Sequence, residues 1–137
     1  MGLDVRAKGL TAETGFSCGY ITFMKFRIEL ARTYNEELGE MYRNLMVDIV
    51  SEHEFSEKYI ERWNELCNHD LDIFLFHSDC DGKFTPKECR GIYNAIKDLH
   101  MDMQGHNYGV MKPYNMLEHW KEIFKHCADR RINLYFE

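Results

Sequence analysis

The residue types best suited to chemistry gather in one short acidic loop, HSDCDG at residues 77–82. Together with the six residues that follow, this loop matches the EF-hand calcium loop, which places oxygen ligands at positions 1, 3, 5, 7, 9 and 12 and glycine at position 6. Gly82 occupies position 6, where the turn requires a residue that takes positive φ readily. Hard cations such as Ca²⁺ and Mg²⁺ prefer carboxylate and carbonyl oxygens. The pattern predicts as ligands His77, Asp79, Asp81, the carbonyl of Lys83, Thr85 and Glu88.

The first loop position departs from this pattern, because His77 stands where an EF-hand has aspartate. Imidazole nitrogen is a poor ligand for calcium, so we expect any binding to be weak. Two other interpretations remain open. In one, Asp79 and Asp81 form turns that satisfy backbone amides and bind no ion. In the other, the loop belongs to a small metal-dependent or thiol enzyme of the hydrolase type, with His77 and Cys80 as its catalytic residues.

A helix start follows the acidic loop directly. Thr85-Pro86-Lys87-Glu88 has the pattern of a capping box, in which Thr85 and Glu88 each accept the other's backbone amide. Pro86 falls at the first helical position, where its missing N–H costs nothing. The same carboxylate of Glu88 therefore has two candidate roles, as a cap and as a cation ligand.

Other histidines and cysteines lie close together in the sequence without a recognisable ligand spacing. His119, His126 and Cys127 share the last predicted helix, and Cys67 and His69 lie near a helix end. None of these spacings is that of a known zinc site. We interpret them as core cysteines and surface histidines.

Composition and charge argue against several classes of function for this protein. The net charge of −6 argues against nucleic acid as a partner, because phosphate binding needs cationic surface. No apolar run approaches the length of a membrane span, and the first ten residues lack the apolar region of a signal peptide. The five cysteines are odd in number and form no CxxC pair, so we expect a cytoplasmic protein with free thiols.

The periodicity of apolar residues predicts a strand at each end of the chain and helices between them. Residues 2–8 and 132–136 alternate as half-buried strands do. The first expected helix runs from about Thr22 to Tyr34, and Asn35 caps the second. A third runs from Ser51 or Ser56 to Cys67, and a short helical turn follows a cap at Asp70. The last two run from Thr85 to Leu99 and from Asn115 onward. A loop is expected over residues 9–19 and again over 100–113. Because a lone strand is unstable, the two terminal strands should pair.

These elements predict a single domain over residues 1–137. Its fold class is α+β and predominantly helical, with about five helices and a small sheet that pairs the N- and C-terminal strands.

Several features, in chain order, resemble a group of small uncharacterised bacterial and phage-associated proteins that share an HSDCDG loop. The features are Met1–Val5, Phe26-Arg27, His77–Gly82, Pro86, Cys89 and the terminal strand. The resemblance implies that His77 belongs to the loop as a unit, and it implies a microbial origin. Residues 35–68 have no counterpart in that group, which leaves open whether they are an insertion.

The function expected from these patterns is that of a non-enzymatic binding or accessory protein. Its acidic loop either binds Ca²⁺ or Mg²⁺ weakly or stiffens the entry to the Thr85 helix. A protein partner fits this expectation, whereas nucleic acid and membrane do not. The alternative is the metal-dependent or thiol enzyme described above.

Overall fold

The computed structural model describes residues 2–10, 16–46, 57–101 and 113–137. These residues contain six helices and one four-stranded antiparallel sheet. The helices are α1 (Tyr20–Tyr34), α2 (Glu36–Met46), α3 (Glu57–Leu66), α4 (His69–Leu75), α5 (Pro86–Ile96) and α6 (Pro113–Arg130). The strands are β1 (Leu3–Arg6), β2 (Phe16–Cys18), β3 (Lys83–Phe84) and β4 (Leu134–Phe136). The predicted α+β, mostly helical fold class is confirmed, with six helices in place of about five.

The sheet joins the two ends of the chain, as predicted. Its strand order is β2-β1-β4-β3, and in the central pair Val5 lies opposite Phe136 and Arg6 opposite Tyr135. The two outer strands were not predicted, and β2 falls within the segment expected to be a loop. Strands of two or three residues carry no periodic signal of their own. They form because β1 and β4 offer them free edges.

Local hydrogen bonds set where several helices begin. The side chain of Asn35 accepts the amide of Leu38 at 3.0 Å, so the predicted cap of α2 is confirmed. For α4 the predicted cap at Asp70 is wrong, because the side chain of Asn68 accepts the amide of Asp70 at 2.8 Å instead. Both residue types cap helices well, and the earlier residue sets the start here.

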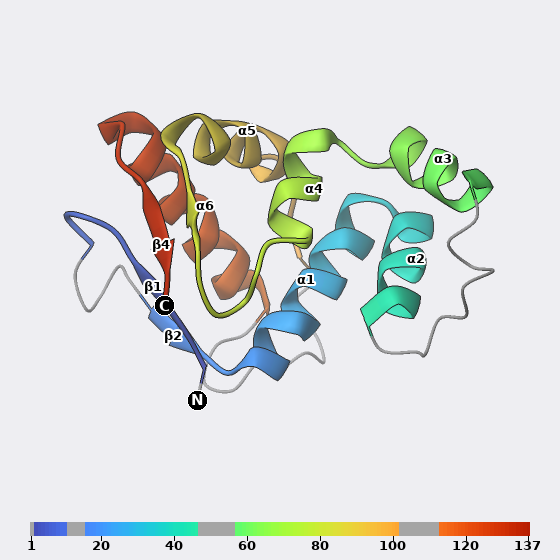
Figure 1. Ribbon diagram of the computed structural model, residues 1–137, viewed down its shortest axis with the longest axis horizontal. Coiled ribbons are helices and arrows are strands. Elements are labelled where there is room, and N and C mark those ends of the chain that lie inside the picture. The colour runs from blue at the N-terminus through green and yellow to red at the C-terminus, as the bar shows by residue number, and fades with distance from the viewer. Residues whose placement is uncertain (1, 11–15, 47–56, 102–112) are drawn as a thin grey trace.

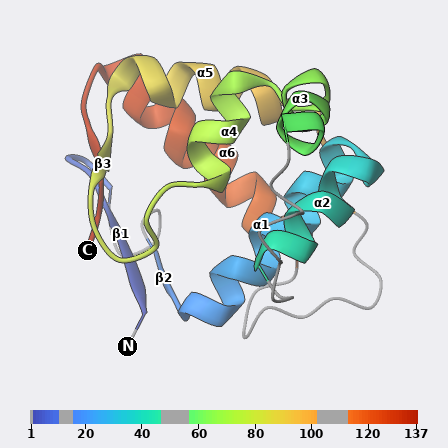
Figure 2. The ribbon, with the colours of Figure 1, turned by 45° about the vertical axis from the view of Figure 1, so that its right-hand side comes forward.

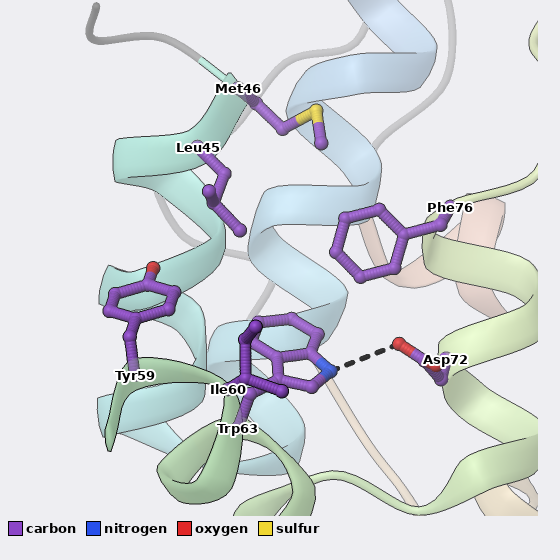
Figure 3. A pocket seen from close by; sticks show the side chains of 7 residues that line it. All are labelled: Leu45, Met46, Tyr59, Ile60, Trp63, Asp72 and Phe76. Carbon is purple, nitrogen blue, oxygen red and sulfur yellow. Dashed lines mark hydrogen bonds between the residues drawn. The ribbon is translucent and has the colours of Figure 1, made fainter. Parts of the chain in front are cut away.

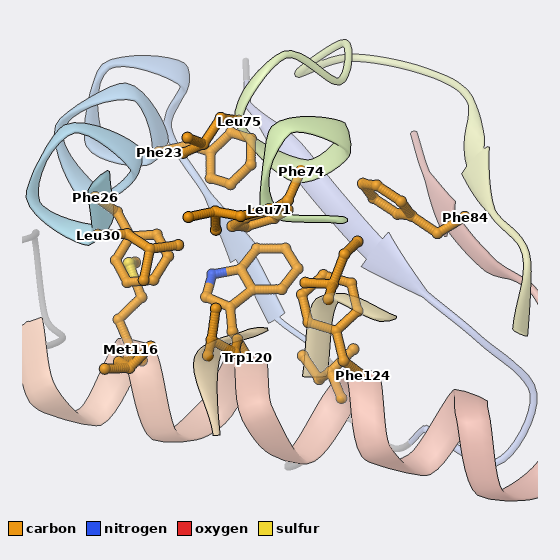
Figure 4. Close-up of a cluster of buried hydrophobic side chains, with 14 of the residues drawn as sticks. Phe23, Phe26, Leu30, Leu71, Phe74, Leu75, Phe84, Met116, Trp120 and Phe124 are labelled. Atoms are coloured by element: carbon orange, nitrogen blue, oxygen red, sulfur yellow. The ribbon is translucent and has the colours of Figure 1, made fainter. Parts of the chain in front are cut away.

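The core is built around the indole of Trp120, which is fully buried (Figure 4). Phe124 stacks against it with ring centroids 5.5 Å apart, and Phe26 does so at 6.4 Å. Phe74 of α4 meets it edge-on at 5.1 Å. Phe84 of β3 is also fully buried, which ties the acidic loop to the core. Offset and edge-on contacts of this kind add to the stability that burial provides.

The sheet lies at one end of the molecule, and α2 and α3 lie at the other (Figures 1 and 2). The α1–α2 and α5–α6 pairs pack closely, and α4 packs against α5. The acidic loop runs from α4 to β3 at the edge of the sheet. The predicted third-helix starts at Ser51 and Ser56, and most of the predicted loop after His100, lie outside the described residues.

Candidate functional site

The acidic loop connects α4 to β3, and aromatic packing fixes its first residue. The ring of His77 lies 4.1 Å from that of Phe84 and 5.1 Å from that of Phe136, between centroids. Its Nδ1 lies 2.9 Å from the carbonyl oxygen of Ser78, and its Nε2 lies 3.2 Å from that of Lys83. Both ring nitrogens therefore face backbone oxygens. Packing of this ring against Phe84 and Phe136 holds the start of the loop beside its end.

A serine and a glycine shape the turn itself. The Oγ of Ser78 accepts the amides of Cys80 at 3.3 Å and Asp81 at 3.4 Å, as serine commonly does in turns. Gly82 has φ +97°, and a Cβ there would lie 3.0 Å from Cε1 of His77. The predicted need for glycine at this position is confirmed, because both the backbone angle and the close ring require it.

Glu88 serves as a helix cap. Its Oε1 accepts the amide of Thr85 at 2.8 Å, and its own amide donates to Oγ1 of Thr85 at 3.2 Å. Pro86 occupies the first position of α5. The predicted capping box is confirmed, and this carboxylate is engaged with the backbone.

The two aspartates of the loop have different surroundings. Asp79 is half-buried and its charge acts on Arg27 and Tyr42, whereas Asp81 is exposed. Among the residues that the structure describes, no group of three or more His, Cys, Asp or Glu side chains is placed to hold a metal ion. The geometry therefore adds no support to the Ca²⁺ or Mg²⁺ site, which stays a prediction.

The thiol-enzyme hypothesis likewise gains no support from the geometry. Cys80 is exposed, and its sulfur lies 3.5 Å from Oγ of Ser78. Within the described loop no hydrogen bond joins this thiol to either ring nitrogen of His77. Without such a contact the imidazole has no direct route to the thiol proton.

A buried arginine lies beneath the start of the loop. Nη1 of Arg27 donates to the carbonyl oxygens of Phe74, Leu75 and His77 at 3.3, 3.0 and 2.7 Å. The hydroxyl of Tyr42 donates to the same Leu75 oxygen at 2.6 Å. Burial lowers the pKa of this guanidinium, and the charges of nearby groups oppose that shift. These bonds fasten the end of α4 to α1 and α2.

The clearest candidate site includes no residue of the acidic loop and is a pocket between α2, α3 and α4 (Figure 3). Its volume is about 340 Å³. Six of its seven lining side chains are apolar or aromatic, and one is a carboxylate. The lining residues are Leu45, Met46, Tyr59, Ile60, Trp63, Asp72 and Phe76.

The wall of this pocket is organised around Trp63. Its Nε1–H donates to Oδ1 of Asp72 at 3.0 Å, and its ring lies 5.2 Å from that of Phe76 and 6.2 Å from that of Tyr42. At the mouth, Ile60 is 50% exposed and Phe76 is 48% exposed. Large apolar side chains exposed together around a hollow commonly mark an interaction site.

Sequence reasoning missed this pocket. The periodicity of apolar residues assigns Ile60 and Trp63 to the core face of a helix, and it assigns Phe76 to a short apolar run. A polar residue such as Asp72 within that run is the one available signal, because it interrupts Leu71–Phe76. Nothing in the sequence indicates that it would meet the indole of a different helix.

The chain matches no protein-family model, and no curated protein or solved structure is significantly similar to it. None of the described helices is long and apolar enough to cross a membrane. All five cysteines are free. The resemblance through the HSDCDG loop therefore stays a prediction.

Proposed function

We propose that this chain is a non-enzymatic binding protein and that the pocket between α2, α3 and α4 is its binding site. One observation carries the proposal, namely a hollow of about 340 Å³ at which Ile60 and Phe76 expose large apolar surfaces. Ligand pockets typically occupy about 300–1,000 Å³ and combine an apolar lining with a few polar groups. This pocket has that size and that lining.

Contacts within the protein hold the pocket wall in place, which also supports the proposal. The indole of Trp63 is fixed by its bond to Asp72 and by the rings of Tyr42 and Phe76. A wall ordered in advance loses little side-chain freedom when a ligand binds, so more of the contact energy appears as affinity.

The proposal is tested with N-phenylnaphthylamine, an uncharged apolar dye that fluoresces when it leaves water. We expect the protein to bind the dye and Ile60→Arg to weaken this binding at least about tenfold, because a charged side chain would enter the apolar mouth. Ile21→Arg is the matched control. Ile21 is also an exposed helical isoleucine, at 67%, and it does not line the pocket.

Equal dye binding by the two variants would contradict the proposal, as would no binding by the unaltered protein. Both substitutions lie on exposed positions and should leave the fold intact. Far-ultraviolet circular dichroism and thermal melting of both variants check this point.

Within this proposal the acidic loop is a structural connector, supported by the bonds of Ser78, His77 and Glu88. Weak binding of Ca²⁺ or Mg²⁺ by the loop remains a separate prediction that a titration decides. We also propose a reducing, cytoplasmic location, which five free cysteines fit. Chemical trapping of thiols in intact cells tests it, since disulfide-bonded cysteines would contradict it.

A further inference from the structure

Building on the proposed function, we infer that the pocket between α2, α3 and α4 takes a small organic cation, a protonated amine carried on an apolar body. The inference rests on the one charged side chain that lines the pocket, Asp72, and on the aromatic rings placed around it.

No cationic side chain among the described residues pairs with the carboxylate of Asp72. Within the described residues its side chain accepts one hydrogen bond, to Oδ1 from the indole N–H of Trp63 at 3.0 Å. Arg62 on the neighbouring helix α3 is engaged elsewhere, with Glu37 and Glu65. A carboxylate at an apolar hollow without a counter-charge favours a cationic ligand and disfavours an anionic one.

Aromatic rings lie around this carboxylate and add to the preference for a cation. Figure 3 shows Trp63 beside Asp72 and Phe76 above it, both toward the pocket, with Tyr59 across the pocket. The faces of aromatic rings carry partial negative charge and attract ammonium groups, with tryptophan the most effective. A ligand ammonium that reaches the carboxylate passes beside these rings, so both interactions act on the same charge.

The wall opposite Asp72 determines which kind of body the cationic ligand can have. It is formed by Leu45, Met46, Tyr59 and Ile60, and none of these side chains carries a charge. Such a wall favours a hydrocarbon body over a polar one. The unbranched side chain of Met46 can adjust to its shape. A volume of about 340 Å³ suits a small molecule.

Three probes that share one body and differ in the head group test this inference: phenylbutylammonium, phenylbutanol and phenylbutyrate. Binding is followed by calorimetry and by the indole N–H signals in NMR spectra. The chain has two tryptophans, and Trp63→Phe assigns the signal that belongs to the pocket. We expect the cation to bind tightest and the carboxylate weakest, and we expect the signal of Trp63 to shift most with the cation.

Asp72→Asn removes the charge while its amide oxygen can still accept from the indole. We expect it to weaken phenylbutylammonium binding about tenfold, because a bond to a charged acceptor is about twice as strong as a neutral one, and to leave phenylbutanol unchanged. Asp70→Asn is the matched control. It removes a negative charge from the same helix, but Asp70 faces Gly91 of α5 and does not line the pocket.

The outcomes separate this inference from the proposed function. Similar affinity for all three probes, with no effect of Asp72→Asn, would overturn the cation preference and leave pocket binding intact. Tightest binding of phenylbutyrate would also overturn it. No binding of any probe or of N-phenylnaphthylamine would overturn both. If Asp72→Asn does not fold, the salt dependence of binding to the unaltered protein is measured instead. Added salt should weaken the binding of phenylbutylammonium and leave that of phenylbutanol unchanged, and equal salt dependence of the two would overturn the inference.

Discussion

Replacing Arg27 with methionine tests how α4 and the loop after it are held. Methionine keeps an unbranched apolar stem in the same space and removes the guanidinium. Nη1 of Arg27 lies within 3.3 Å of three carbonyl oxygens at the end of α4, and the side chain is only 7% exposed. The substitution therefore removes a buried cation together with the bonds that it donates.

The expected cost follows from the donors on Nη1. This nitrogen carries two hydrogens, so it makes about two strong bonds, each worth about 1.5–3 kcal/mol when the donor is charged. Two effects reduce the loss. The Nε of Arg27 is buried without a partner among the described residues, and Tyr42 continues to donate to the carbonyl of Leu75. We expect the free energy of unfolding to fall by about 3 kcal/mol.

Urea denaturation followed by circular dichroism measures this change. Arg32→Met is the control, because Arg32 lies on the same helix and pairs at the surface with Glu29 and Glu40, so its loss should cost at most about 1 kcal/mol. Arg27→Met combined with Tyr42→Phe should cost more than the two single changes together, by at least about 0.5 kcal/mol, because Leu75 then loses both donors. A loss below about 1 kcal/mol for Arg27→Met would refute this account of how α4 is held.

The remaining predictions concern a buried tyrosine, a helix cap and the acidic loop. Burial raises the pKa of Tyr42 to about 12, above the usual value of about 10. Above pH about 10 the unfolded chain therefore binds fewer protons than the folded one, so stability should fall as pH rises toward about 12, by at most about 2–3 kcal/mol. Tyr42→Phe should flatten that fall in urea titrations at several pH values, and an unchanged slope would contradict it. Thr85→Ala should cost about 1–2 kcal/mol in thermal melts, whereas Thr85→Ser should cost little. Burial raises the pKa of Cys67 to about 12, so iodoacetamide should modify exposed Cys80 well before Cys67 in peptide mass spectra. Reaction of Cys80 far faster than an ordinary thiol would instead favour the thiol-enzyme hypothesis. If the loop binds Ca²⁺ or Mg²⁺, millimolar cation should raise the melting temperature and Asp79→Ala should abolish the rise, whereas no rise in the unaltered protein would end the cation prediction.

Predictions that depend on a few neighbouring residues were confirmed. The capping box of Thr85 and Glu88, the cap at Asn35 and the positive φ of Gly82 are all formed by groups within a few positions of one another. The alternating patterns at the two ends likewise predicted that β1 and β4 would pair. Where two nearby residues can both cap a helix, the sequence did not identify the one that does. The cap of α4 is Asn68, whereas Asp70 was predicted.

The sequence by itself thus determined where α2 and α5 begin, the glycine that the acidic loop needs and which fold class results, because these depend on local hydrogen bonds and on the period of apolar side chains. It did not determine the start of the last helix, which was expected at Asn115 and lies at Pro113. Only the tertiary structure decided that Asp79 lies near Arg27 while Asp81 faces solvent. It also decided that Asp72 meets the indole of Trp63 at a pocket. Contacts of this kind join helices whose relative placement depends on the packing of the whole core, and no short stretch of sequence carries that information.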